Sequence, residues 1–259
     1  ASVVSGSQAC ALPISHIINQ DTRLLGETPI LMDTQRHLTK GAVVMRGLWF
    51  GFATMIATAS AAAAQAELSF YGGIQDVRAS TVSGTDPSGG AFNFSADWEG
   101  RSLVVPRYFG VRLTWWRTDD FGWGLDFSRN KAYASDQTLA DNGLAALEFS
   151  DGLNLLTLNA YRRWKNSISH LTPYVGAGVG ISIPHVEFDS GAGRTAEYQI
   201  GGPAVLVVAW ASYPLNDRWS VFGEYKGSYS VNNVELVNGG SLSTDIRTSA
   251  FNLGVSLGF

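Results

Sequence analysis

A histidine and a glutamate stand two positions apart in the segment Pro184-His185-Val186-Glu187-Phe188. On an extended chain, residues at i and i+2 project to the same side, so these two side chains share a face. A neutral imidazole beside a carboxylate can bind a divalent metal ion or act as an acid–base pair. The spacing also fits a simpler interpretation, in which an interfacial histidine lies beside a solvated glutamate.

Two more segments carry carboxylates that can join the same chemistry. Residues 97–101 read Asp-Trp-Glu-Gly-Arg, and residues 147–152 read Leu-Glu-Phe-Ser-Asp-Gly. A fold that brings both segments close to His185 would gather carboxylates from three loops around one imidazole. The competing interpretation is a set of acids that are simply solvated.

The composition excludes several other kinds of chemistry. The single cysteine, Cys10, rules out a disulfide scaffold and a cysteine-rich zinc module. A formal net charge of −4 rules out a polybasic nucleic-acid binder, so we expect no nucleic-acid partner. A serine–histidine hydrolase is disfavoured, because no His-x-Ser pair occurs at a predicted strand.

The segment that starts at Met45 has the features of a secretory signal peptide. Arg46 supplies a positive start, residues 48–57 form a short apolar run, and the small residues up to Ala66 end in an A-x-A pattern. We therefore predict cleavage after Ala66. The predicted parts are a non-native, disordered upstream extension at 1–44, the signal peptide at 45–66 and the mature protein at 67–259.

Apolar and polar residues alternate with a period of two along most of the mature chain, which indicates strands whose two faces meet different surroundings. The pattern recurs in eight segments of about ten residues, which is the length of a tilted transmembrane strand and about twice that of an ordinary strand. The predicted strands span about 67–77, 104–117, 121–130, 153–164, 172–184, 203–213, 218–230 and 247–259.

The connections between these strands alternate in length. The long ones are 78–103, 131–152, 185–202 and 231–246, and the short ones are 118–120, 165–171 and 214–217. Outer-membrane barrels have long extracellular loops and short periplasmic turns. The predicted fold is therefore all-β, an eight-stranded antiparallel transmembrane up-and-down β-barrel of outer-membrane type, integral to the bacterial outer membrane with its long loops extracellular.

The inner face of the predicted barrel is rich in glycine and carries few charges. Eight strands leave room for side chains but are too few for an open pore, which disfavours a general porin. The inward charges on this parity are Arg112, Asp126, Glu224 and Lys226. Buried charges are tolerated when they are paired, and we predict that these four form a structural network.

Three segments, Asp97-Trp98-Glu99, Glu148-Phe149-Ser150-Asp151 and Pro184-His185, resemble the alphaproteobacterial outer-membrane family of lipid A oxidases. The resemblance extends over nearly all of 67–259, although the stretch 216–225 is shared with small outer-membrane barrels generally. It implies an oxidoreductase that converts the proximal glucosamine of lipid A to 2-aminogluconate. It also implies O₂ as co-substrate, hydrogen peroxide as product and a divalent metal ion as a candidate cofactor.

The resemblance transfers no assigned catalytic residues, so the site hypothesis rests on the residue types. His185 and Glu187 would bind a metal ion or take a proton from the anomeric hydroxyl of the sugar. Glu148 would assist them as a third catalytic residue.

Five further residues would hold the substrate in this hypothesis. Glu99 and Asp151 would complete the metal coordination or position the sugar. Trp98 would stack on the sugar ring. Arg101 or Arg194 would pair with a phosphate group.

Lipid A, lipopolysaccharide and other outer-membrane lipids are the expected partners, and we expect a monomer. The alternative function is a non-catalytic small barrel that serves envelope stability, adhesion or lipopolysaccharide binding. In that case divalent cations bridge the rim carboxylates to lipopolysaccharide. Another lipid A modifier, such as a deacylase, is disfavoured by the missing His-x-Ser pair.

Overall fold

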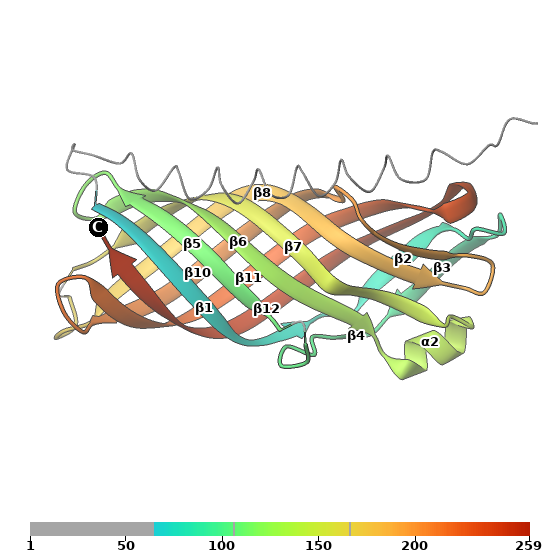
Figure 1. Ribbon diagram of the computed structural model, residues 1–259, viewed down its shortest axis with the longest axis horizontal. Coiled ribbons are helices and arrows are strands. Elements are labelled where there is room, and N and C mark those ends of the chain that lie inside the picture. Colours follow the sequence, from blue (N-terminus) through green and yellow to red (C-terminus); the bar gives the residue numbers. More distant parts are fainter. Residues whose placement is uncertain (1–64, 106, 166) are drawn as a thin grey trace, which may run out of the picture. The chain divides into compact units, whose positions relative to one another are not determined.

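The computed structural model describes residues 65–105, 107–165 and 167–259, with the side chain of residue 150 left aside. The predicted upstream extension and the predicted signal peptide up to residue 64 lie outside the described residues. Within the described residues, the chain forms a closed antiparallel barrel of tilted strands (Figure 1).

Eight long strands make the ring in the described part of the chain, and each pairs with its neighbours in sequence. Strand β1 pairs with β12 from Glu67–Gly258 through to Val77–Thr248, which closes the ring. The predicted barrel is confirmed. Its strands are β1 (Gln65–Val77), β5 (Phe109–Trp116), β6 (Phe121–Ala134), β7 (Ala146–Arg163), β8 (Thr172–Asp189), β10 (Gly202–Pro214), β11 (Trp219–Leu236) and β12 (Gly240–Gly258).

Short elements extend the barrel at its loop end. Strands β2 (Ser80–Thr85) and β3 (Ala91–Ala96) form a hairpin on β12, while β4 (Trp98–Glu99) pairs with β6 and β9 (Arg194–Tyr198) pairs with β8. The helix α2 (Asp136–Asn142) joins β6 to β7, and the short helix η1 (Val237–Gly239) joins β11 to β12. No helix in the described residues is both long and apolar enough to cross a membrane.

The strands differ from the predicted ranges mainly at the loop end. Strand β5 starts at Phe109 rather than at 104, since residues 104, 105, 107 and 108 lie outside the strands. Conversely, the predicted long loop 231–246 is mostly strand, since β11 and β12 stay paired up to Leu236 and Gly240. The pattern of apolar outward residues ends there, although inward residues such as Val234 and Leu242 still pack in a core.

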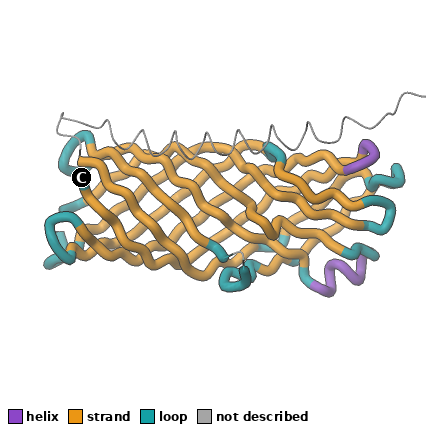
Figure 2. The backbone as a smooth tube through the Cα atoms, in the orientation of Figure 1, coloured by secondary structure: helices purple, strands orange, loops and turns teal. Residues whose placement is uncertain are grey.

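The outer wall carries a belt of exposed apolar side chains, which we call the apolar band. Such a wall can face lipid, because the backbone N–H and C=O groups of a closed barrel are hydrogen-bonded between neighbouring strands and none needs water. Figure 2 shows the strands that carry it tilted across the whole barrel wall. The band includes Phe70, Ile74, Phe109, Leu125, Leu158, Val179, Ile181, Val207, Phe251 and Leu253.

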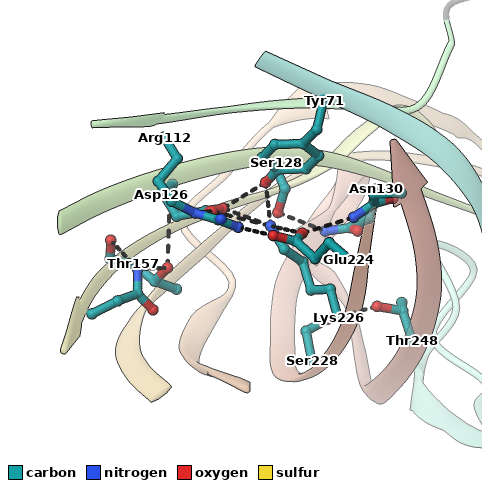
Figure 3. Close-up of polar contacts among 12 residues, drawn as sticks. Tyr71, Arg112, Asp126, Ser128, Asn130, Thr157, Glu224, Lys226, Ser228 and Thr248 are labelled. Carbon is teal, nitrogen blue, oxygen red and sulfur yellow. Dashed lines mark hydrogen bonds and ion pairs between the residues drawn. The ribbon is translucent and has the colours of Figure 1, made fainter. Parts of the chain in front are cut away.

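An ionic network fills the middle of the interior (Figure 3). Arg112 donates hydrogen bonds to Asp126 Oδ2 at 2.9 Å and to Glu224 Oε2 at 2.5 Å. The Lys226 ammonium lies 2.9 Å from Asp126 Oδ1 and donates to the Tyr71 hydroxyl. The predicted pairing of the four inward charges is confirmed.

Two packed layers lie on either side of this network. Towards the short turns, aromatic side chains dominate, and Tyr174 and Trp210 stack with ring centroids 4.4 Å apart. Towards the long loops, an apolar core includes Phe149, Phe188 and Leu242. The interior is therefore filled by side chains along its length, as expected for a barrel of this size.

Glycines on the inner face make room for the large rings of this interior. A Cβ atom added at Gly110 would lie 2.0 Å from the Tyr71 ring, and one added at Gly176 would lie 2.2 Å from the Tyr161 ring. The glycine-rich inner face thus serves packing.

Candidate functional site

A row of paired residues crosses four strands at the loop end of the barrel. Glu99 on β4 pairs with Tyr133 on β6, Tyr133 with Glu148 on β7, and Glu148 with Glu187 on β8. Residues directly opposite in an antiparallel pair project from the same face, with Cβ atoms about 4.5–5.5 Å apart. Their chain neighbours, including Phe149, are buried in the core, so the row projects outward. Three of the predicted carboxylates are thus brought onto one outer surface.

Arginines flank this row on both sides. Arg101 Nε donates to Glu99 Oε2 at 2.8 Å, and its guanidinium lies 4.8 Å from the centre of the Tyr133 ring. The hydrogen bond to Glu99 raises the pKa of Arg101 above its ordinary value. At the other side, Arg194 donates to Glu187. Both arginines that were predicted to bind phosphate therefore lie on this surface, paired with carboxylates.

His185 lies next to the row and faces Asp151. The His185 Nδ1 atom is 3.9 Å from Asp151 Oδ2, which is within ion-pair range for a protonated imidazole. The Arg129 guanidinium lies 3.6 Å from the other oxygen of the same carboxylate. Asp151 therefore stands between a cation and the imidazole. The 3.9 Å separation is too long for a hydrogen bond, and His185 Nδ1 is buried without a hydrogen-bond partner among the described residues.

Tyr198 on β9 covers the imidazole. Its ring meets that of His185 edge to face at 4.7 Å, and its hydroxyl donates to the Asp151 carbonyl oxygen at 3.0 Å. The His185 side chain is 12% exposed as a result. It is thereby held in a defined orientation.

Asp151 reaches the outer surface through an irregularity in β7. Strict alternation from Glu148 would point residue 151 into the barrel, but the register with β8 shifts between Glu148 and Leu153. Gly152 has a φ of +128°, a conformation that favours glycine. A β-bulge of this kind re-aims side chains and is over-represented near active sites.

We call the whole surface the outer-wall cluster. It lies directly beyond the apolar band, because His185 follows Ile181 and Ile183 on the outward side of β8 and Arg129 follows Leu125 and Phe127 on β6. Its members are Glu99, Arg101, Arg129, Tyr133, Glu148, Asp151, His185, Glu187, Arg194 and Tyr198.

Trp98 is the one predicted substrate-binding residue that lies elsewhere. It is 7% exposed, its ring packs against Phe149 at 5.8 Å, and its indole N–H donates to Ser80 Oγ at 2.9 Å. Adjacent strand residues face opposite sides, so an outward Glu99 requires an inward Trp98. The predicted stacking of Trp98 on a sugar is wrong for this geometry.

Three residues of the cluster were not predicted from the sequence. Arg129, Tyr133 and Tyr198 supply a cation and two aromatic rings on the outer surface. The alternation of β6 could have indicated Arg129, which continues the outward face of Leu125 and Phe127. The same alternation could have indicated Tyr133, four residues after Arg129, because the inward Ala132 and Ala134 keep the parity of Asn130.

The predicted metal ligands His185 and Glu187 do share a face, but their surroundings do not form a metal site. Glu187 is bound by Arg194, and His185 faces Asp151. In the part of the chain that the structure describes, no three His, Cys, Asp or Glu side chains come close enough to share one ion.

No protein-family model matches the sequence, and no curated protein matches it either. Among solved structures, Neisserial surface protein A is 15% identical, covering 75% of this chain and 97% of its own with a TM-score of 0.41. The outer membrane protein OprG from Pseudomonas aeruginosa is 14% identical, with coverages of 76% and 96% and a TM-score of 0.48. The outer membrane protein AlkL is 16% identical, with coverages of 78% and 94% and a TM-score of 0.44.

These similarities concern architecture, at identities too low to carry a function. The pairing of β1 with β12 and the apolar outer wall provide the firmer argument. A closed antiparallel barrel with lipid-facing side chains is the solution that strands adopt in a membrane. The described chain is an integral β-barrel of the outer-membrane type, with its short turns periplasmic and its long connections extracellular.

Proposed function

We propose that the outer-wall cluster acts on lipid A, and that it oxidises the proximal glucosamine to 2-aminogluconate with O₂ as oxidant. The observation that carries the proposal is the position of the cluster. It lies on the outside of the barrel, immediately beyond the apolar band. This is the level at which the sugars and phosphates of an outer leaflet would begin. A site for a soluble substrate would have no reason to face the lipid.

The reaction converts a cyclic hemiacetal into a lactone. The anomeric hydroxyl loses its proton, the C1–H bond breaks, and two electrons pass to O₂, which leaves with two protons as hydrogen peroxide. Water then opens the lactone to the acid. In this scheme His185 Nε2 takes the hydroxyl proton, and the nearby Asp151 carboxylate stabilises the imidazolium that forms.

The remaining members of the cluster fit the parts of the substrate. Arg101 and Arg194 can exchange their carboxylate partners for phosphate groups, which accept the same bidentate hydrogen bonds. Tyr133, between Glu99 and Glu148, is 9% exposed and packs against the Arg101 guanidinium, so it helps to position that cation. The carboxylates would accept hydrogen bonds from sugar hydroxyls.

The test is expression in a strain whose lipid A lacks aminogluconate, followed by mass spectrometry of the extracted lipid A. We expect aminogluconate with the wild-type chain and none with His185→Ala. The matched control is His170→Ala, which changes the other histidine of the mature chain, in the turn beside Tyr213. Unchanged product in His185→Ala would remove the central residue of the proposal. Treating the membranes with a chelator shows whether a divalent metal ion takes part.

The second candidate function is lipopolysaccharide binding without catalysis. It is favoured by the pairing of cations and carboxylates across the cluster, as in Arg129 with Asp151 and Arg194 with Glu187. Surfaces of this kind bind phosphorylated lipids through exchangeable ion pairs. If lipid A stays chemically unchanged while it copurifies with the wild type and not with Arg129→Ala, this second function holds.

A further inference from the structure

The loop between β4 and β5 presents three consecutive apolar side chains to the outside. Leu103, Val104 and Val105 are 71%, 54% and 76% exposed. In Figure 2 the loop projects from the lower wall near the middle of the barrel, well short of the hairpins at the loop end. A run of exposed apolar residues at one point of a surface marks an interaction site.

The protein holds this loop in place with hydrogen bonds to two strands. The Lys131 ammonium on β6 donates to the Val104 carbonyl oxygen at 2.8 Å and to that of Arg101 at 3.2 Å. On the other side, the backbone N–H of Gln75 on β1 donates to Ser102 Oγ at 2.8 Å. The apolar tip is therefore a fixed projection.

The hydrogen bonds also define the level of the loop on the wall. Strand β5 pairs with β1 up to Gly72, and beyond that point the loop occupies the space between β1 and β6. Its contact Gln75 follows Ile74, which is 60% exposed and pairs with Phe251, itself 66% exposed. The tip thus projects at the outer end of the apolar band.

Positive charges flank the tip in the sequence. Arg101, which belongs to the outer-wall cluster, precedes the three apolar residues, and the exposed Arg107 follows them. Apolar side chains bordered by arginines match an outer-leaflet lipid, whose acyl chains lie beside its phosphate groups.

We propose that Leu103, Val104 and Val105 insert between acyl chains of outer-leaflet lipids, and that Arg101 and Arg107 bind the phosphates of the same lipids. The loop is then a lipid-docking surface next to the outer-wall cluster. The inference requires a barrel that spans the membrane and does not require that the protein be an enzyme.

The test uses single cysteines, each labelled with an environment-sensitive fluorophore, in a Cys10→Ser background reconstituted into phosphatidylcholine vesicles. Val105→Cys is compared with Leu253→Cys, a site in the apolar band, and with Ala140→Cys, an exposed site on α2. Lipids with a spin label on the acyl chain quench fluorophores that lie within the bilayer. We expect blue-shifted emission and strong quenching at residues 105 and 253, and neither effect at residue 140.

Emission from residue 105 that matches that from residue 140 would overturn the proposal. A label that is water-exposed in vesicles but shielded in intact cells would also overturn it, because a protein partner would then cover the loop. The measurement is repeated in His185→Ala, where loss of oxidation and unchanged quenching would separate this inference from the proposed function. A second variant, Val105→Asp, is expected to abolish the quenching of a label at residue 103, with folding checked by the gel mobility of unheated samples.

Discussion

Arg112 is a single residue on which much of the interior depends. It is 1% exposed and pairs with two buried carboxylates, Asp126 and Glu224, while its guanidinium lies 4.7 Å from the centre of the Trp210 ring. Such a charge is stable in the interior only together with its partners, since each partner compensates for the lost hydration of the other.

Replacing Arg112 by Met should therefore destabilise the barrel strongly. The change removes the guanidinium that pairs with the buried carboxylates of Asp126 and Glu224. It should lower the free energy of unfolding by about 3–5 kcal/mol. Urea unfolding in detergent or vesicles measures it. The control is Arg162→Met, which removes an ion pair to Asp120 with side chains 61% and 56% exposed and should cost no more than about 1 kcal/mol. Equal effects of the two variants would contradict the role assigned to the network.

A substitution at Asp151 can distinguish a role in supporting His185 from a role in binding the substrate. Asp151→Asn removes the charge that faces His185 and should lower kcat by about 100-fold or more, in the range of general acid–base catalysis, with a smaller effect on KM. The assay follows aminogluconate formation in membranes. Asp245→Asn is the control, because Asp245 accepts a hydrogen bond from Tyr229 outside the cluster. A change in KM with kcat unaltered would mean that Asp151 serves binding.

At the scale of elements, one irregular strand shapes the outer-wall cluster. The bulge in β7 shifts its register with both β6 and β8 and places Asp151 on the outer surface together with Glu148. The glycine that allows the shift in β7 is Gly152, where an added Cβ atom would lie 2.5 Å from Asn154 Oδ1.

Gly152→Ala should consequently damage both the fold and the cluster. We expect a loss of stability of about 1–3 kcal/mol from the strained backbone and a loss of lipid A oxidation, because the Asp151 side chain would turn away from His185. Gly89→Ala provides a matched comparison, since Gly89 has a φ of +95° with open space around it and lies in the β2–β3 turn. That variant should lose stability and keep its activity.

The sequence could predict the barrel because period-two alternation over membrane-length strands has one structural solution. It could also predict which segments meet at the rim, since alternating connection lengths place them at the same end. It could not predict the bulge of β7 at 148–153, because a bulge adds residues without changing the composition. The error at Trp98 has another cause: Trp98 and Glu99 are adjacent on a regular strand, so they face opposite sides of the wall.

At the scale of the whole molecule, three layers of side chains fill the lumen. The ionic network lies between an aromatic layer near Trp210 and an apolar core near Phe149. Because side chains fill the interior, a functional site must lie on the outer surface or in the loops.

The purified barrel should therefore give no stable conductance steps in planar bilayers. The same preparation must show correct folding by gel mobility, and a general porin in the same apparatus serves as the positive control. Reproducible ohmic channels from the folded protein would contradict a filled lumen and would reopen the possibility of transport.

The seam between β1 and β12 has a consequence for how the molecule is made. Ser69 and Ser256 share a hydrogen bond of 2.8 Å across this seam although 187 residues separate them in the chain. Contacts between such distant positions form late, because the entropy of closing the intervening chain must be overcome first. Until β12 arrives, β1 and β11 each present an open edge that invites pairing with another chain. Closing the seam with β12 removes both open edges at once, so the barrel is exposed to wrong pairing until its last strand is in place.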